Sequence, residues 1–255
     1  MHQVMFLVLF CLASISGCGG GGADYVDNPQ NEKSSEYVNM PAGFQVIGDH
    51  GVVQIDENYT NMGLRHRGQA ALTGLSDLVV TDVDTPLLCI KSPNMAVMLV
   101  GATRSGNTIT YRLASAAGTI DWFVFDKMRA PPAGSSGAGL QVYTSAGVLA
   151  FDSTNPPMRV VGIADLANAQ QGVYPPPPGS ITATVGDYAA CLSFARVRAT
   201  YGNQPDVMLG DGVRTSATGA STEMVVFKQI PPYALPGDYL QPAGGKLFMV
   251  DVTNL

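Results

Sequence analysis

The sequence carries little charge, and its positive charge is especially sparse. Asp, Glu, Lys and Arg make up only 13% of the 255 residues, and the formal net charge is -6. The densest basic cluster is Arg65-His66-Arg67. Nucleic-acid-binding proteins need a concentrated basic face. We therefore expect no nucleic-acid partner.

Residues that ligate metals are also scarce. The chain has three His and four Cys, and no Cys/His spacing has the form of a zinc site. Asp82 with Asp84, and Asp206 with Asp211, are candidate calcium ligands, but each pair falls short of the ligand number that calcium requires. We interpret all four as solvated turn carboxylates and expect neither a metal nor another cofactor.

Motifs for nucleophilic catalysis and nucleotide binding are incomplete. The segment 134–137, Gly-Ser-Ser-Gly, does not complete the G-x-S-x-G pattern around either serine. The segment 137–139, Gly-Ala-Gly, lacks the third glycine and the following helix of a dinucleotide fingerprint. A Walker-type loop is missing as well. The sequence therefore predicts a protein that is not an enzyme.

The sequence is rich in residues that form turns between β-strands. It contains 29 Gly and 17 Pro, which with Asn and Ser separate short runs of alternating apolar residues. This pattern is typical of all-β sandwiches and related folds. We predict an all-β protein with long Pro/Gly loops and little helix, at most a turn or two at 165–171. The four prolines 175–178 predict an exposed polyproline-type loop.

One hairpin pattern occurs twice. The segment 43–56, GFQVIGDHGVVQID, has two alternating runs around turn residues. The segment 139–152, GLQVYTSAGVLAFD, repeats it 96 residues later with Gly, Gln, Val, Gly, Val and Asp in the same places, and Met62 recurs as Met158. The repeat predicts an internal duplication into two β-sandwich-like units, 40–133 and 139–255. Whether they share one core stays open.

Later in the chain the offset between equivalent residues becomes 102. It relates Cys89 to Cys191, and also Val124 to Val226. Cysteine between apolar neighbours behaves as a small core residue, so we expect two buried free thiols. The alternative is a disulfide, which export would permit but which requires equivalent positions to meet near a symmetry axis.

The amino-terminal region has the pattern of an export signal. An apolar run from Val4 to Ile15 is of signal-peptide length and too short to span a bilayer as a helix. It ends in Ile15-Ser16-Gly17-Cys18, which resembles the lipobox of bacterial lipoproteins, although no Lys or Arg precedes it. The resemblance implies a signal at 1–18, acylation of Cys18 and a location in the cell envelope, at the outer membrane.

Residues 19–39 are Gly-rich and then polar, and they predict a flexible tether. On this interpretation the membrane is reached only through the lipid on Cys18. The alternative is that the protein starts at Met40, where Met-Pro-Ala-Gly introduces the first hairpin. Its location would then be a virion tail.

Aromatic residues offer candidates for a binding surface. Trp122, the only tryptophan, lies in an apolar run and is expected in the core. Tyr174, Tyr233 and Tyr239 lie in Pro/Gly-rich segments, where an exposed ring can stack on a sugar or pack against a protein. Ordinary surface tyrosines are the alternative interpretation.

Several segments together resemble a family of phage and prophage tail-associated proteins of unknown activity. These are Met-Pro-Ala-Gly-Phe-Gln-Val at 40–46, Gly-Leu-Gln-Val at 139–142, Phe-Asp-Ser at 151–153 and Arg-Val-Val at 159–161. The resemblance spans roughly residues 40–165. It implies a non-enzymatic structural protein associated with a tail tip or fibre, with other tail proteins as partners. It brings no catalytic residues.

Two hypotheses of different classes follow. The first is the structural tail protein. The second is an outer-membrane lipoprotein that presents a β-rich module on its tether and binds a cell-surface glycan or protein. The amino terminus of the native protein distinguishes them. Acylation of Cys18 would exclude the plain tail protein, and a peptide beginning at Pro41 would exclude the lipoprotein.

Overall fold

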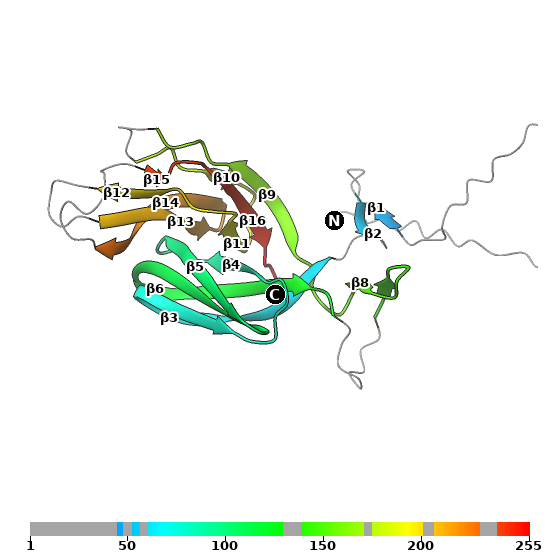
Figure 1. The fold of residues 1–255 in the computed structure, drawn as a ribbon. Coiled ribbons are helices and arrows are strands. Elements are labelled where there is room, and N and C mark those ends of the chain that lie inside the picture. The colour runs from blue at the N-terminus through cyan, green and yellow to red at the C-terminus, as the bar shows by residue number, and fades with distance from the viewer. Residues whose placement is uncertain are drawn as a thin grey trace, which may run out of the picture. The chain divides into compact units, whose positions relative to one another are not determined.

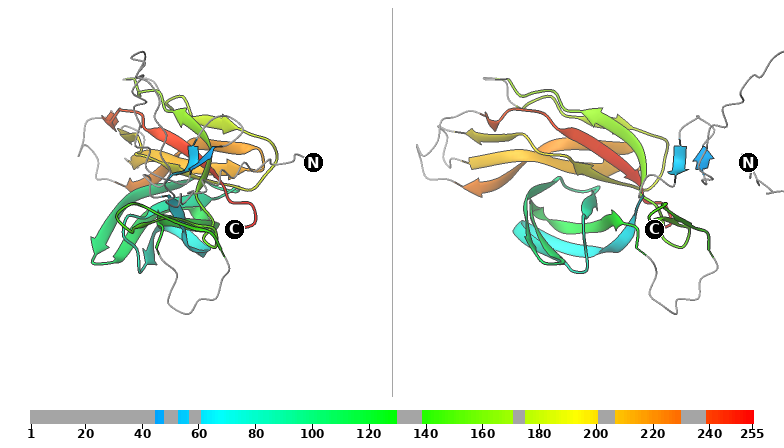
Figure 2. Two further views of the ribbon diagram at one scale, coloured as in Figure 1. Left: turned by 90° about the vertical axis from the view of Figure 1, so that its right-hand side faces the viewer. Right: turned by 45° about the vertical axis from the view of Figure 1, so that its right-hand side comes forward.

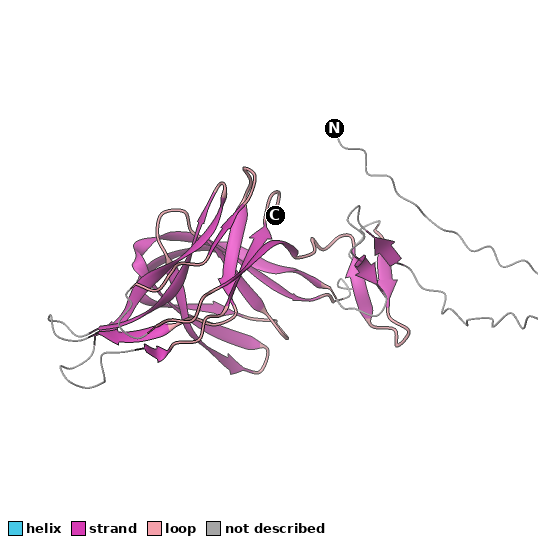
Figure 3. Cartoon of the chain, turned by 90° about the horizontal axis from the view of Figure 1, so that it is seen from above, coloured by secondary structure: helices cyan, strands magenta, loops and turns pink. Residues whose placement is uncertain are grey.

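The structure is a computed structural model that describes residues 45–47, 53–56, 61–129, 139–170, 175–200, 207–229 and 239–255. The chain divides into residues 1–41 and a second unit, 42–255, which contains every described residue. The described residues form strands and loops without a helix (Figure 3). The all-β prediction is confirmed. No helix suited to crossing a membrane occurs in these segments.

Sixteen strands are described (Figure 1). They are β1 (Gln45–Ile47), β2 (Val53–Asp56), β3 (Met62–Val80), β4 (Leu87–Lys91), β5 (Val97–Ser105), β6 (Thr108–Lys127), β7 (Gln141–Tyr143), β8 (Leu149–Asp152), β9 (Arg159–Asp165), β10 (Ser180–Thr182), β11 (Tyr188–Leu192), β12 (Val197–Thr200), β13 (Val207–Ser216), β14 (Gly219–Gln229), β15 (Tyr239–Gln241) and β16 (Lys246–Asp251).

Strands from both predicted units belong to one twelve-stranded antiparallel sheet. Its main path runs β10-β14-β13-β5-β6-β4-β11-β16-β9, with β3 paired to β6, β12 to β13 and β15 to β12. Strands β3 to β6 and strands β9 to β16 form two groups (Figure 2), which join where β4 pairs with β11 and β5 with β13. The sheet is nearly closed, because β9 and β10 at its two ends approach each other. The two units therefore share one sheet.

The two predicted hairpins fold alike. Strands β1 and β2 form one two-stranded sheet, and β7 and β8 form another. In each hairpin the Gln lies opposite the terminal Asp, Gln45 with Asp56 and Gln141 with Asp152, and each register shifts at the third pair. Both hairpin predictions are confirmed, and the equivalent pairs keep the offset of 96.

A similar arrangement of strands occurs in both halves of the large sheet. In the first half β3 and β4 flank the later part of β6, and in the second half β9 and β11 flank β16. Strands β3 and β9 each carry one extra residue at the same point, Arg65 and Val161, again 96 apart. By contrast, Val226 of β14 pairs with Leu209 of β13, whereas Val124 of β6 pairs with Leu88 of β4. The sequence match between Val124 and Val226 thus has no counterpart in the strand registers.

The apolar core lies on both faces of the central strands. The larger cluster contains Val97 from the first half and Val213 from the second, which also pair directly between β5 and β13. A second cluster packs on the opposite face around Cys89, Phe125 and Cys191. Because successive strand side chains alternate between faces, the apolar run of β4 supplies both clusters.

The join between β5 and β13 depends on glycine. A Cβ on Gly212 would lie 2.6 Å from the Val225 side chain and 2.9 Å from the backbone carbonyl carbon of Val97. Only a residue without a side chain permits this approach. On the same join, the Ser92 N–H donates to Thr215 Oγ1 at 2.8 Å, and the Thr215 N–H donates to the Ser92 carbonyl at 3.0 Å.

The predicted short helix is wrong for residues 165–170. Asp165 ends β9, and the next residues form a loop that lies beside 242–245. The Leu166 N–H donates to the Gly245 carbonyl and the Ala169 N–H to the Pro242 carbonyl. The second bond takes the N–H that a helix beginning at Asp165 would pair with the Asp165 carbonyl, and the side chains of Leu166 and Ala169 are buried. Gln171 lies outside the described residues.

Candidate functional site

The most developed polar site in the described segments is an ion pair in the second half. Arg196 precedes β12 and Asp211 lies within β13, and their side chains are only 1% and 2% exposed. Arg196 Nε donates to Asp211 Oδ2 at 2.8 Å and Nη2 donates to Oδ1 at 2.9 Å. The Arg196 backbone N–H also donates to Oδ2 at 2.8 Å. This is the bidentate arrangement in which a guanidinium matches a carboxylate best.

The rest of the guanidinium holds two loop segments. Nη1 of Arg196 donates to the carbonyl of Ala167 at 2.9 Å and to the carbonyl of Pro177 at 3.1 Å. These carbonyls flank the undescribed residues 171–174. The ion pair therefore fixes the proline-rich loop to the sheet. A buried charge is tolerated because almost all of its donors are satisfied.

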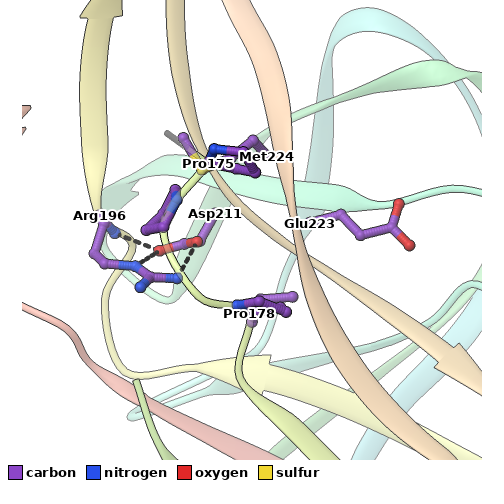
Figure 4. A pocket seen from close by; sticks show the side chains of 8 residues that line it. Pro175, Pro178, Arg196, Asp211, Glu223 and Met224 are labelled. Carbon is purple, nitrogen blue, oxygen red and sulfur yellow. Dashed lines mark hydrogen bonds and ion pairs between the residues drawn. The ribbon is translucent and has the colours of Figure 1, made fainter. Parts of the chain in front are cut away.

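Above the ion pair lies a pocket of about 350 Å³ (Figure 4). Its lining combines prolines with residues of β14: Pro175, Pro176, Pro178, Thr222, Glu223 and Met224. The Glu223 side chain points away from Arg196 and Asp211 (Figure 4) and pairs with Arg214 at 3.0 Å. With the guanidinium already neutralised, the pocket suits an apolar side chain or the CH face of a sugar better than an anion.

The proline loop only partly follows its prediction. Pro175, Pro177 and Pro178 are exposed, as expected for a polyproline-type loop. Pro176 is buried, and the Gly179 N–H donates to Thr222 Oγ1 at 2.9 Å. The loop is thus packed on the sheet and forms one wall of the pocket.

The predicted binding aromatics are not brought together in the described structure. Tyr174 and Tyr233 lie outside the described residues. Tyr239 begins β15, where its backbone pairs with Arg198, and its side chain is not described. Tyr174 immediately precedes Pro175 of the pocket. The sequence interpretation missed Arg196, which had no motif around it.

The interpretation of Asp211 as a solvated turn residue is wrong, because it is buried in β13 against Arg196. Asp82 and Asp84 are half exposed and each faces a cation: Asp82 pairs with Arg65 and Arg129, and Asp84 pairs with Lys127. Within the described segments, no three His, Cys, Asp or Glu side chains gather in a metal-binding group. Asp206 lies outside them.

The Asp that ends the hairpin motif has a structural role. Asp152 is fully buried, and its carboxylate accepts hydrogen bonds from Gln141 at 3.0 Å and from the N–H and hydroxyl of Thr154 at 2.8 and 2.6 Å. Burial raises the pKa of Asp152, but these bonds outweigh it and leave the pKa below its ordinary value of 3.8. The repeated Gln and Asp thus close a cross-strand pair.

Cys18, the predicted lipidation site, lies outside the described residues. In comparisons with known proteins, the chain matches no protein family, no curated protein and no solved structure.

Proposed function

We propose that this chain is a non-enzymatic structural protein of a phage or prophage tail. The observation that carries the proposal is the fold of residues 139–161, which hold most of the resemblance to tail-associated proteins. Their hairpin has a small core of its own, in which Val142, Leu149, Ala150 and Phe151 pack with Met128. It is attached to the sheet by backbone bonds such as Asn61 N–H to the Ala150 carbonyl at 3.0 Å.

The hairpin also presents apolar side chains to solvent. Leu140, Tyr143 and Val148 are 46–53% exposed. Exposed apolar groups on a small, firmly attached element favour contact with another protein. We assign this face to a neighbouring tail protein. The matching registers of the two hairpins and of the two halves of the sheet support a duplicated scaffold, a form suited to presenting one contact element twice.

The second candidate function is a lipoprotein of the cell envelope. It is favoured by Ile15-Ser16-Gly17-Cys18 and the Gly-rich segment that follows. In that case the proline-walled pocket is the candidate site for a glycan or an apolar peptide side chain, since its lining offers apolar surface over a neutral ion pair.

Particles released from the native host after prophage induction test the tail proposal. We expect the chain to copurify with tails and to yield an amino-terminal peptide beginning at Pro41. Recovery of the chain only in the membrane fraction, with acyl chains on Cys18, would overturn it. The variant Cys18→Ser then separates a lipid anchor from ordinary membrane association.

A double variant and its control test the assigned contact face. The double variant, Leu140→Asp with Val148→Asp, places charge on the exposed side of the hairpin. Its incorporation into particles should fall at least about tenfold, the equivalent of 1.4 kcal/mol. Val185→Asp is the matched control, because Val185 is 81% exposed elsewhere. Equal incorporation of the hairpin variant and the control would contradict the assignment.

A further inference from the structure

Cys89 and Cys191 occupy equivalent positions in the paired strands of the two halves. Cys89 in β4 lies opposite Phe123 of β6, and Cys191 in β11 lies opposite Phe248 of β16. Their neighbours keep the same relation, since Leu88 faces Val124 and Ala190 faces Met249. For the two cysteines, unlike Val124 and Val226, the offset of 102 thus relates residues in equivalent strand pairings.

Strands β4 and β11 are also neighbours of each other. They pair antiparallel with Ile90 opposite Ala190, and one further step along this register places Cys89 opposite Cys191. Two equivalent strands in an antiparallel pair are related by a local two-fold axis, and this register puts the axis between the two cysteines. A disulfide between equivalent positions requires that they lie beside a symmetry axis, and the two cysteines do.

The two thiols share one face and one core cluster. Cys89 is 0% exposed and Cys191 5%, and both pack with Phe123, Phe125 and Val250. Directly opposed residues of an antiparallel pair have Cα atoms about 4.5–5.5 Å apart. A disulfide spans Cα separations of about 4.4–6.8 Å. The backbone arrangement therefore admits a bond without a change of register.

We propose that Cys89 and Cys191, which are free thiols in this structure, form a disulfide that joins the two halves of the sheet when the protein meets a disulfide oxidant. The proposal goes beyond the proposed function. It applies equally to a tail released from the reducing cytoplasm and to a protein exported to the envelope, because both leave the reducing compartment.

The reaction is ordinary thiol–disulfide exchange with a low-molecular-weight disulfide such as oxidised glutathione. The thiolate of one cysteine attacks a sulfur of the oxidant, which forms a mixed disulfide and releases one glutathione thiolate. The thiolate of the second cysteine then attacks the protein sulfur of that mixed disulfide and releases the second glutathione. Two protein thiols lose two electrons and two protons, and one oxidised glutathione becomes two reduced molecules.

The environment determines when the bond can form. The hydrogen bond with the neighbouring Cys191 thiol and burial together raise the pKa of Cys89 well above its ordinary value, and the thiolate is the attacking species. Oxidation of the closed sheet is therefore slow. We expect the bond to form during folding, or while the β4–β11 contact is open.

The test uses the full chain with Cys11 and Cys18 changed to Ser, so that only two cysteines remain. The protein is refolded in glutathione redox buffers, quenched with an alkylating reagent and digested with trypsin. We expect peptide 68–91 linked to peptide 160–196. The equilibrium constant for this bond should exceed that measured in denaturant by about tenfold or more, and the oxidised protein should unfold at a higher temperature than the reduced one.

Cys191→Ala on the same background is the control, and it should remove both the linked peptides and the redox dependence of Tm. Two results would overturn the proposal. One is complete alkylation of both cysteines after refolding in oxidising buffer. The other is an equilibrium constant in native buffer no larger than that in denaturant.

Discussion

Ser92 and Thr215, which are 123 residues apart, exchange two hydrogen bonds across the join between the halves: Ser92 N–H to Thr215 Oγ1, and Thr215 N–H to the Ser92 carbonyl. Both residues are buried, with 0% and 3% exposure. This reciprocal pair joins the residue that follows β4 to β13 and adds to the single backbone pairing between β5 and β13.

Thr215→Val should destabilise the protein, because it leaves the buried Ser92 N–H without its acceptor. The expected loss in the free energy of unfolding is about 1–3 kcal/mol, measured by denaturant unfolding. Thr103→Val, at an exposed position of β5, should change it by less than about 0.5 kcal/mol. Equal losses would show that the hydrogen bond across the join contributes nothing specific.

Gly212→Ala tests the close approach of β5 and β13. The added methyl group would meet the Val97 backbone, which cannot move without breaking the pairing with Val213. We expect a loss of about 1–3 kcal/mol, the range for overpacking. Gly101→Ala is the matched control, because no atom lies within 4 Å of the added Cβ, and it should be neutral or mildly stabilising. The measurement is the midpoint of thermal or urea unfolding for both variants.

Arg196→Ala should be among the most damaging substitutions in the chain. It leaves Asp211 buried without its cation and releases the carbonyls of Ala167 and Pro177, with an expected cost of about 3–5 kcal/mol. Arg112→Ala removes a partner of Asp77 from a pair that is 58% and 43% exposed, and should cost less than about 1 kcal/mol. Similar unfolding free energies for the two variants would show that the contacts of Arg196 with Asp211 and the two loop carbonyls do not stabilise the fold.

Acid should weaken the fold through Asp126, which is 1% exposed. Burial raises its pKa, but backbone N–H donors from Asp84, Thr85 and Lys127 outweigh burial and hold the pKa below 3.8. Protonation therefore favours the unfolded chain. The stabilisation is complete above the ordinary pKa of 3.8 and is lost as pH falls through the lower, folded value.

Asp126→Asn removes this titration, so its unfolding free energy should fall less steeply below about pH 3.8 than that of the unmodified protein. Denaturant unfolding between neutral and acidic pH measures both curves. Parallel curves would show that Asp126 does not contribute to acid sensitivity.

The sequence predicts the local elements of this fold well where alternation and turn residues agree. The Gln and Asp of 139–152 specify a hairpin because a two-residue period and its turn are encoded within fourteen positions. Leu166 and Ala169 mislead for the opposite reason. Their spacing fits a turn of helix, but both N–H groups bind carbonyls of the distant segment 242–245, and the Ala169 N–H is thereby lost to a helix. Such long-range partners leave no trace in a local pattern.

The candidate site shows the same limit. Asp211 lies between two glycines in the sequence, which predicts a turn, yet it is in a strand and forms an ion pair with Arg196. Neither residue carries a recognisable motif, since the pairing depends on which strands become neighbours. The cysteines are intermediate: the repeat predicts that they are equivalent, and only the sheet topology shows that equivalent strands adjoin.

The position of β16 has a consequence for the order of folding. This strand, the last one described, lies between β9 and β11, which precede it by some 80 and 50 residues. Strand β11 can already pair with β4, but β9 has no paired strand until the ribosome has released residues 246–251. Because such distant contacts close slowly, we expect the second half to depend on chaperones while β9 waits with an unpaired edge.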